Sequence, residues 1–76
     1  MYRLKQSSID EFKLIRAVGY ASLIGINDTF VSSILNANKP CSEMLARSMI
    51  SVRFNISLQE TDKINELLEK HFIKEK

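Results

Sequence analysis

Polar side chains gather between positions 28 and 39, and most of them recur at helical spacing. The group comprises Asp28, Thr29, Ser32, Ser33, Asn36, Asn38 and Lys39. Hydroxyl, amide and carboxyl groups can hydrogen-bond to base edges in a DNA groove, and equally to a polar protein surface. No arginine or lysine lies between positions 28 and 36, so the stretch lacks the cations that usually read guanine. The residues therefore predict a recognition surface and leave open whether it binds DNA or protein.

The rest of the sequence gives no support to catalysis. The chain has one cysteine, Cys41, and one histidine, His71, which are too few for a tetrahedral metal site or an internal disulfide. It has no glycine-rich phosphate loop, and no nucleophile stands at a recognisable spacing from a base. We therefore expect no enzyme activity, no metal and no cofactor, and we expect Cys41 to be a small buried apolar residue.

Most of the polar stretch lies on a predicted helix, which follows an earlier helix and a tight turn. A short apolar run ends at Gly25, and Asn27 is a suitable N-cap for the next helix, with Asp28 at its positive end. The apolar stripe of that second helix consists of Phe30, Val31, Ile34 and Leu35. Residues 36–38 are the expected exit, since asparagine tolerates the left-handed conformation. This layout predicts a helix-turn-helix.

The remaining elements are expected to be mostly helical, because only two glycines and one proline interrupt the chain. Capping boxes at Ser8 and Ser57 predict two further helix starts, although the end of the first helix stays open. A helix near 41–51 precedes an alternating segment, 52–56, which is typical of a short strand and could pair with residues 2–4. We expect an all-α fold, a compact helix-turn-helix domain of about five helices with that one short two-stranded pairing.

Length and charge restrict the class of protein further. The 76 residues, 45% of them apolar, predict a single domain over 1–76. The net charge of +2 is far below that of a strong non-specific nucleic-acid binder. No apolar run is long enough to span a bilayer, and the N-terminus lacks a signal core. Together with the unpaired cysteine, this predicts a cytoplasmic protein without a membrane partner.

The C-terminal segment, 57–76, is expected to be an amphipathic helix. Its apolar face consists of Ile64, Leu67, Leu68 and Phe72. A domain this small has little core with which to cover that face, and an exposed apolar stripe usually marks an interface. We therefore expect this face to form a homodimer or to contact another partner.

The central segment resembles the Cro/lambda-repressor-type helix-turn-helix family over roughly residues 20–50. The residues that carry the resemblance are Ala21, Gly25, Asn27, Val31, Ser32, Ile34, Leu35, Asn36, Lys39, Pro40, Leu45 and Ala46. The chain departs from the family at Ala37, where glycine is usual, and in the region before Ala21, which is shortened.

The resemblance implies a small regulator that binds operator DNA in a bacteriophage or mobile-element switch. The base-reading positions that it implies are Asp28, Thr29 and Ser33, with Ser32 beside them. Candidate phosphate contacts are Lys13, Arg16, Asn36, Asn38 and Lys39.

A repressor protein of the same fold is the alternative partner. A recognition helix without basic side chains suits a protein groove, and Phe30, Thr29 and the neighbouring serines would form a small contact patch. The chain would then be an antirepressor or a modulator of repression, and the sequence does not separate the two functions.

Overall fold

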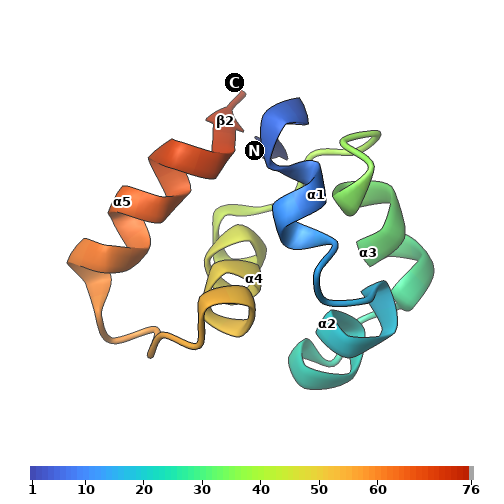
Figure 1. The fold of residues 1–76 in the computed structure, drawn as a ribbon, viewed down its shortest axis with the longest axis horizontal. Helices are drawn as coiled ribbons and strands as arrows, with labels where there is room; N and C mark the ends of the chain where they lie inside the picture. Colours follow the sequence, from blue (N-terminus) through green and yellow to red (C-terminus); the bar gives the residue numbers. More distant parts are fainter. Residues whose placement is uncertain (76) are drawn as a thin grey trace.

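The computed structural model describes residues 1–75 as a mostly helical fold with a small two-stranded sheet (Figure 1). In chain order, the elements are β1 (Tyr2–Leu4), the 3-10 helix η1 (Gln6–Ser8), α1 (Ile9–Phe12), α2 (Ala17–Ile24), α3 (Asp28–Leu35), α4 (Glu43–Phe54), α5 (Thr61–His71) and β2 (Phe72–Lys74). The expected all-α fold of five helices is confirmed for these residues. Lys76, the last residue of the expected domain, lies outside the described residues.

The longest helix, α4, lies between α5 on one side and α1, α2 and α3 on the other (Figure 1). Every element except η1 contributes an apolar side chain to the core. The largest fully buried side chains are those of Tyr20, Phe12, Leu4, Ile34, Met49, Ile50, Ile64, Val31 and Cys41. Because these residues come from both ends of the chain as well as from its middle, the terminal segments are part of the same core as the helix-turn-helix.

The two-stranded pairing exists, but its second strand is not the one expected. β1 pairs antiparallel with β2, and Leu4 lies opposite Phe72. The strand predicted over 52–56 is wrong, because α4 continues to Phe54 and ends at Asn55 in the left-handed conformation (φ 55°). The Phe54 ring packs edge-on against Phe12, with 5.8 Å between centroids, so the last turn of α4 places this half-buried residue against the core as a strand would have done.

Of the two predicted helix starts, the one at Ser8 is confirmed, because α1 begins at Ile9 with Ser8 as its N-cap, whereas the one at Ser57 is shifted. Ser8 makes no capping hydrogen bond, since its Oγ lies 2.8 Å from Nδ1 of His71 instead. α5 begins at Thr61 with Glu60 as its N-cap, and the Glu60 carboxylate accepts a 3.3 Å hydrogen bond from the backbone N–H of Ser57. The capping box therefore orders the approach to α5 rather than its first turn. α1 is a single turn, and residues 13–16 separate it from α2.

The expected exposed face of the C-terminal helix is wrong. Ile64, Leu68 and Phe72 are 1%, 5% and 3% exposed, and Leu67 is half-buried. The reason is that α5 packs back on α4 and the chain returns to β1, so this face closes the core (Figure 1). It is therefore not available as the interface that its composition suggested.

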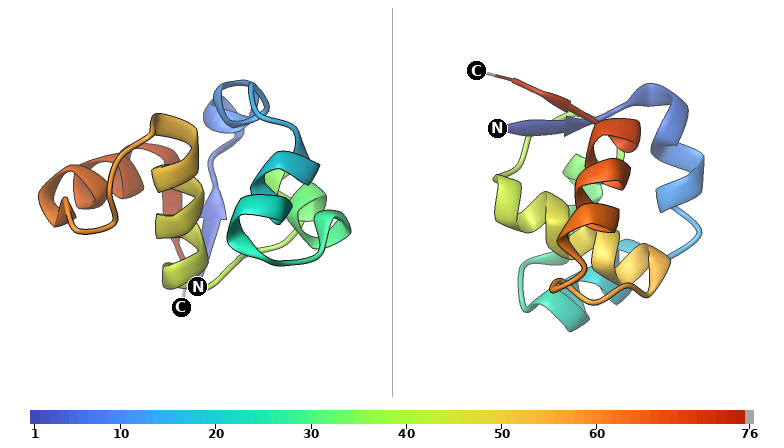
Figure 2. Two further views of the ribbon diagram at one scale, coloured as in Figure 1. Left: turned by 90° about the horizontal axis from the view of Figure 1, so that it is seen from below. Right: turned by 90° about the vertical axis from the view of Figure 1, so that its left-hand side faces the viewer.

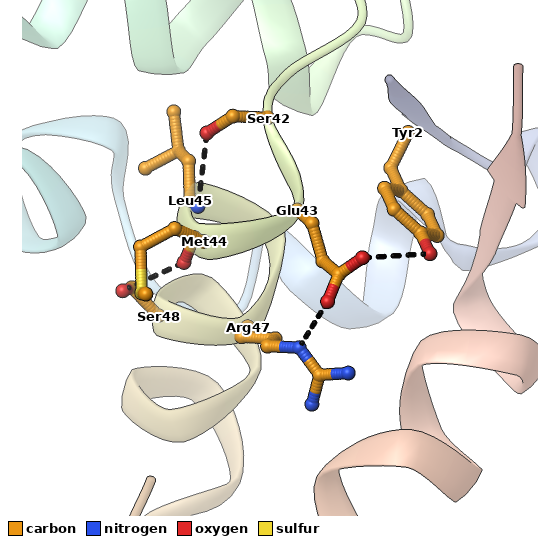
Figure 3. Close-up of polar contacts among 7 residues, drawn as sticks. All are labelled: Tyr2, Ser42, Glu43, Met44, Leu45, Arg47 and Ser48. Carbon is orange, nitrogen blue, oxygen red and sulfur yellow. Dashed lines mark hydrogen bonds and ion pairs between the residues drawn. The ribbon is translucent and has the colours of Figure 1, made fainter. Parts of the chain in front are cut away.

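Polar contacts connect the N-terminal strand to the start of α4 (Figure 3). Tyr2 donates from its hydroxyl to Oε1 of Glu43 (3.3 Å), and Arg47 donates from Nε to Oε2 of the same carboxylate (3.0 Å). The hydrogen bond from Arg47 is the main cause that lowers the pKa of Glu43. Ser42 caps the helix by accepting from the N–H of Leu45 (3.2 Å). These contacts hold β1 and α4 together.

Candidate recognition surface

The turn between α2 and α3 is fixed by Gly25 and Asn27. Gly25 is left-handed (φ 83°), and its N–H donates to the carbonyl of Ala21 (2.7 Å). Asn27 caps α3 with Oδ1, which accepts from the N–H groups of Thr29 (2.8 Å) and Phe30 (3.3 Å). Both predictions for this turn are confirmed. A helix C-terminus and a helix N-terminus are thus joined by the short segment 25–27, which sets the orientation of α3.

Apolar packing holds α3 against α2. Val31, Ile34 and Leu35 are 0%, 0% and 3% exposed, and α2 is the element that α3 contacts most. On α2, the Tyr20 hydroxyl donates to the carbonyl of Phe12 (2.6 Å), which links α1 to the pair. Burial of these branched side chains keeps one face of α3 inward and therefore forces its polar face outward.

The exit of α3 uses an alanine in the left-handed conformation. Ala37 has φ 60°, and its N–H donates to Ile34 O (2.9 Å) while the N–H of Asn38 donates to Ser33 O (3.0 Å). This pair of bonds is a Schellman motif. The expectation that an asparagine would take the left-handed position is wrong here. Arg3 donates from Nη1 to the Ala37 carbonyl (2.8 Å), so a contact from β1 supports the unusual residue.

The outward face of α3 is polar, with one aromatic residue at its margin. Asp28, Thr29 and Asn36 are exposed, whereas Ser32 and Ser33 are half-buried. Phe30, expected on the apolar stripe, is 37% exposed, because it lies about 100° around the helix from Val31.

The polar groups of this face are not equally available. Ser33 donates from Oγ to Thr29 O (3.2 Å), and Asn36 donates from Nδ2 to Ser32 O (2.9 Å). Within residues 1–75, the hydroxyls of Thr29 and Ser32 make no hydrogen bond of their own. These two hydroxyls are therefore the ones that can bond to a partner without first breaking an internal contact.

A groove of about 380 Å³ lies between the first turns of α2 and α3. Its lining residues are Arg16, Ala17, Val18, Asp28, Thr29 and Ser32. It contains both available hydroxyls, with a guanidinium and a carboxylate beside them. Val18, 56% exposed, was not among the sequence candidates. Val18 lies outside the inward-facing stripe of Ala17, Tyr20 and Ala21. That position on the helix is the sequence signal that could have identified Val18 as an exposed residue of this surface.

The structure brings two predicted phosphate contacts next to α3. Lys13 donates from Nζ to Oδ1 of Asn36 (2.5 Å), so the loop after α1 reaches the C-terminal end of α3. Arg16 lies in the groove at its N-terminal end. Asn38 and Lys39 are exposed in the loop that follows α3. Cationic groups therefore flank both ends of the helix that itself carries none.

Within the described residues, Cys41 and the metal-ligating side chain types provide no second site. Burial raises the pKa of the Cys41 thiol to about 11, so this cysteine is protonated and inert at neutral pH. Within residues 1–75, no group of three or more His, Cys, Asp or Glu side chains is placed to hold a metal ion. In the same residues, no helix combines the length and apolar character needed to cross a membrane.

No protein-family model, curated protein or solved structure matches this chain.

Proposed function

We propose that this chain is a small, Cro-like transcription regulator that binds operator DNA with α3 in the major groove. One observation carries the proposal. The Gly25–Asn27 turn and the buried side of α3 present the free hydroxyls of Thr29 and Ser32 on an outward polar face. Serine and threonine hydroxyls bond to several base edges, and the threonine methyl suits the methyl of thymine. The resemblance to the Cro/lambda-repressor-type family supports the same reading, with a phage or mobile-element switch as its cytoplasmic setting.

The flanking cations supply the expected phosphate contacts. Lys13, Arg16 and Lys39 surround α3, and none of them forms an ion pair within residues 1–75. Each neutralised phosphate contributes about −0.9 to the slope of log affinity against log salt concentration. Three contacts give a slope of about −3 for one copy, and two copies on a palindromic operator give about −5. Binding should therefore be modest and strongly salt-dependent.

Fluorescence anisotropy tests this function directly. The probes are a labelled pool of random duplexes of about 30 base pairs and the DNA that flanks the chain's own gene. Lys39→Ala should weaken binding to all duplexes alike, because it removes a phosphate contact.

Thr29→Val should change the base preference selected from the pool, because it removes a free hydroxyl at nearly constant volume. Ser33→Ala is the matched control, and should change that preference less because its hydroxyl is already bonded to Thr29 O. Absence of binding to every duplex at low salt would refute the proposal.

A second candidate function, an antirepressor that binds a helix-turn-helix repressor, is favoured by one specific observation. α3 carries an exposed carboxylate, Asp28, and a partly exposed aromatic ring, Phe30, but no cation. A carboxylate repels DNA phosphates, whereas it attracts the basic DNA-reading surface of a repressor.

Asp28→Asn separates the two functions by the sign of its effect. DNA affinity should rise or stay unchanged, while association with a repressor should slow, most clearly at low salt. To measure both effects, the wild type and Asp28→Asn are each titrated against the flanking DNA and against a helix-turn-helix repressor encoded beside the chain's own gene. A weakened protein complex without DNA binding by either variant would establish the antirepressor and exclude the DNA-binding regulator.

A further inference from the structure

The loop that leaves α3 lies against the N-terminal strand. This exit loop, residues 36–41, includes three of the candidate phosphate contacts, which are Asn36, Asn38 and Lys39. At its far end, Tyr2 and Cys41 exchange two backbone hydrogen bonds of 2.7 Å each. Figure 2 shows the two ends of the chain side by side, next to the segment that joins α3 to α4. The exit loop is therefore fixed by β1 at Cys41, and its conformation depends on what holds its beginning.

Arg3 holds the beginning of the exit loop. Its Nη1 donates to the carbonyl of Ala37 (2.8 Å), and Ala37 is left-handed (φ 60°). An alanine in that conformation is strained, because its Cβ lies close to the carbonyl oxygen that follows it. The guanidinium binds this same oxygen, and a charged donor gives a stronger bond than a neutral one. The contact therefore acts on the residue that sets the direction in which the chain continues to Asn38 and Lys39.

The Arg3 side chain is itself held from the other end of the chain. Its Nε donates to Oε2 of Glu75 (2.8 Å). Arg3 lies opposite Ile73 in the sheet, so Glu75 is its diagonal neighbour on the same face. The two side chains are 31% and 37% exposed, which means that solvent screens part of their attraction. Because the guanidinium is planar and rigid, fixing Nε also fixes the direction in which Nη1 points.

We propose that Arg3 is a positioning residue of the candidate recognition surface, and that Glu75 acts through it. Held by the Glu75 carboxylate, the guanidinium fixes the left-handed turn at Ala37 and thereby the place of Asn38 and Lys39 beside α3. Arg3 does so without touching DNA. The expected effect on DNA affinity rests on the proposed function, whereas the effect on the turn is independent of any partner.

Amide hydrogen exchange of the full chain, measured by NMR without DNA, tests the effect on the turn. The reporter is the N–H of Asn38, which donates to Ser33 O (3.0 Å) while the turn is formed. The matched reference is the N–H of Ile26, which donates to Ala21 O (3.1 Å) at the same position of the turn after α2. Arg3→Met should accelerate exchange at Asn38 about tenfold relative to Ile26, because the turn loses a charged hydrogen-bond donor.

Glu75→Gln tests whether the coupling passes through Arg3. The change keeps the shape of the side chain but removes its charge, and should accelerate exchange at Asn38 about threefold. In the Arg3→Met background the same change should alter that rate by less than about 1.5-fold, because the carboxylate acts through the guanidinium. Equal effects of Glu75→Gln in the two backgrounds, or acceleration at Ile26 as large as at Asn38, would overturn the proposal. Circular dichroism melting of each variant checks that it is folded.

Ala37→Gly provides a rescue that does not restore the charge. Glycine takes the left-handed conformation readily, so Arg3→Met combined with Ala37→Gly should return exchange at Asn38 to within about threefold of wild type. In fluorescence anisotropy, Arg3→Met should weaken binding to all duplexes about twofold per bound copy, because fewer molecules hold the turn. Ala37→Gly should restore that affinity. Binding that stays weak after the glycine is added would make Arg3 a direct phosphate contact and overturn its positioning role.

Failure of this inference would differ from failure of the proposed function. Unchanged exchange at Asn38 in Arg3→Met would overturn the inference and leave DNA binding by α3 standing. The expected exchange pattern in a protein that binds no duplex would refute the DNA-binding regulator, while the effect of Arg3 on the exit loop would stand.

Discussion

The two glycines of this chain lie in neighbouring turns of the same segment, yet alanine should have opposite effects at the two positions. Gly25 is left-handed (φ 83°) and an added Cβ would have no heavy atom within 4 Å. Gly19 lies inside α2, where an added Cβ would be 3.0 Å from Cγ2 of Ile15. Gly25→Ala therefore tests backbone conformation without a steric clash, whereas Gly19→Ala combines a better helix former with one close contact.

The magnitudes follow from these two environments. A non-glycine residue in the left-handed region costs about 1–2 kcal/mol, and the reduced entropy of the unfolded chain returns about 0.4–1 kcal/mol. Gly25→Ala should therefore lower the free energy of unfolding by about 1 kcal/mol, which corresponds to a fall in Tm of about 4–8 °C for a domain of this size. Gly19→Ala gains up to about 1 kcal/mol of helix propensity. The half-buried Ile15 side chain must shift slightly, so the net effect should lie between zero and that gain.

Urea unfolding followed by circular dichroism measures both variants, with Gly25→Asn as the intermediate case because asparagine tolerates the left-handed region. The expected order of stability at position 25 is glycine, then asparagine, then alanine. If Gly25→Ala is as stable as wild type, the turn between α2 and α3 does not require a left-handed residue, and the geometry assigned to the recognition surface is wrong.

Three further outcomes are expected. Ile34→Ala should lower the free energy of unfolding by about 2–5 kcal/mol, because Ile34 is fully buried between α3 and the core; an unchanged urea midpoint would exclude this packing. Leu68→Asp should unfold the protein, because Leu68 is 5% exposed and an isolated charge is not tolerated there; a folded variant by circular dichroism would contradict its place in the core. Burial, followed by the positive charge of Lys70, lowers the pKa of His71. The unfolded chain then binds this proton more readily, so the contribution to stability is complete above about pH 6.5 and is lost as the pH falls through that value toward the lower folded pKa. Melting curves from pH 8 to pH 5 should show this loss, His71→Gln should reduce it, and an equal loss in both proteins would assign it to other groups.

The sequence by itself determined the local features of the candidate recognition surface. A glycine followed two residues later by an asparagine is enough to predict the end of α2 and the cap of α3, because both depend on backbone conformation and on hydrogen bonds within a few residues. The stripe of Val31, Ile34 and Leu35 likewise predicts which side of α3 is buried, since helical periodicity alone decides it.

Only the tertiary structure decided which polar groups of that surface are free. The sequence treats Ser32 and Ser33 as equivalent, but the Oγ of Ser33 is bonded to Thr29 O, while Ser32 faces the groove beside Arg16. The Ser33 bond is local, one helical turn back, but the groove beside Ser32 exists only because the start of α2, with Arg16 before it, lies against the start of α3. That approach is not encoded in the spacing of the residues in α3.

The partner of β1 and the role of the C-terminal helix also depended on long-range contacts. Alternation of apolar and polar residues over 52–56 fits a strand, but it fits equally the last turn of a helix in which Phe54 packs against Phe12. The apolar face of α5 looked unpartnered because sequence does not show that Phe72 returns to lie opposite Leu4. Contacts between residues nearly seventy positions apart are set by the packing of the whole core, and a local pattern carries no information about which distant segment will cover it.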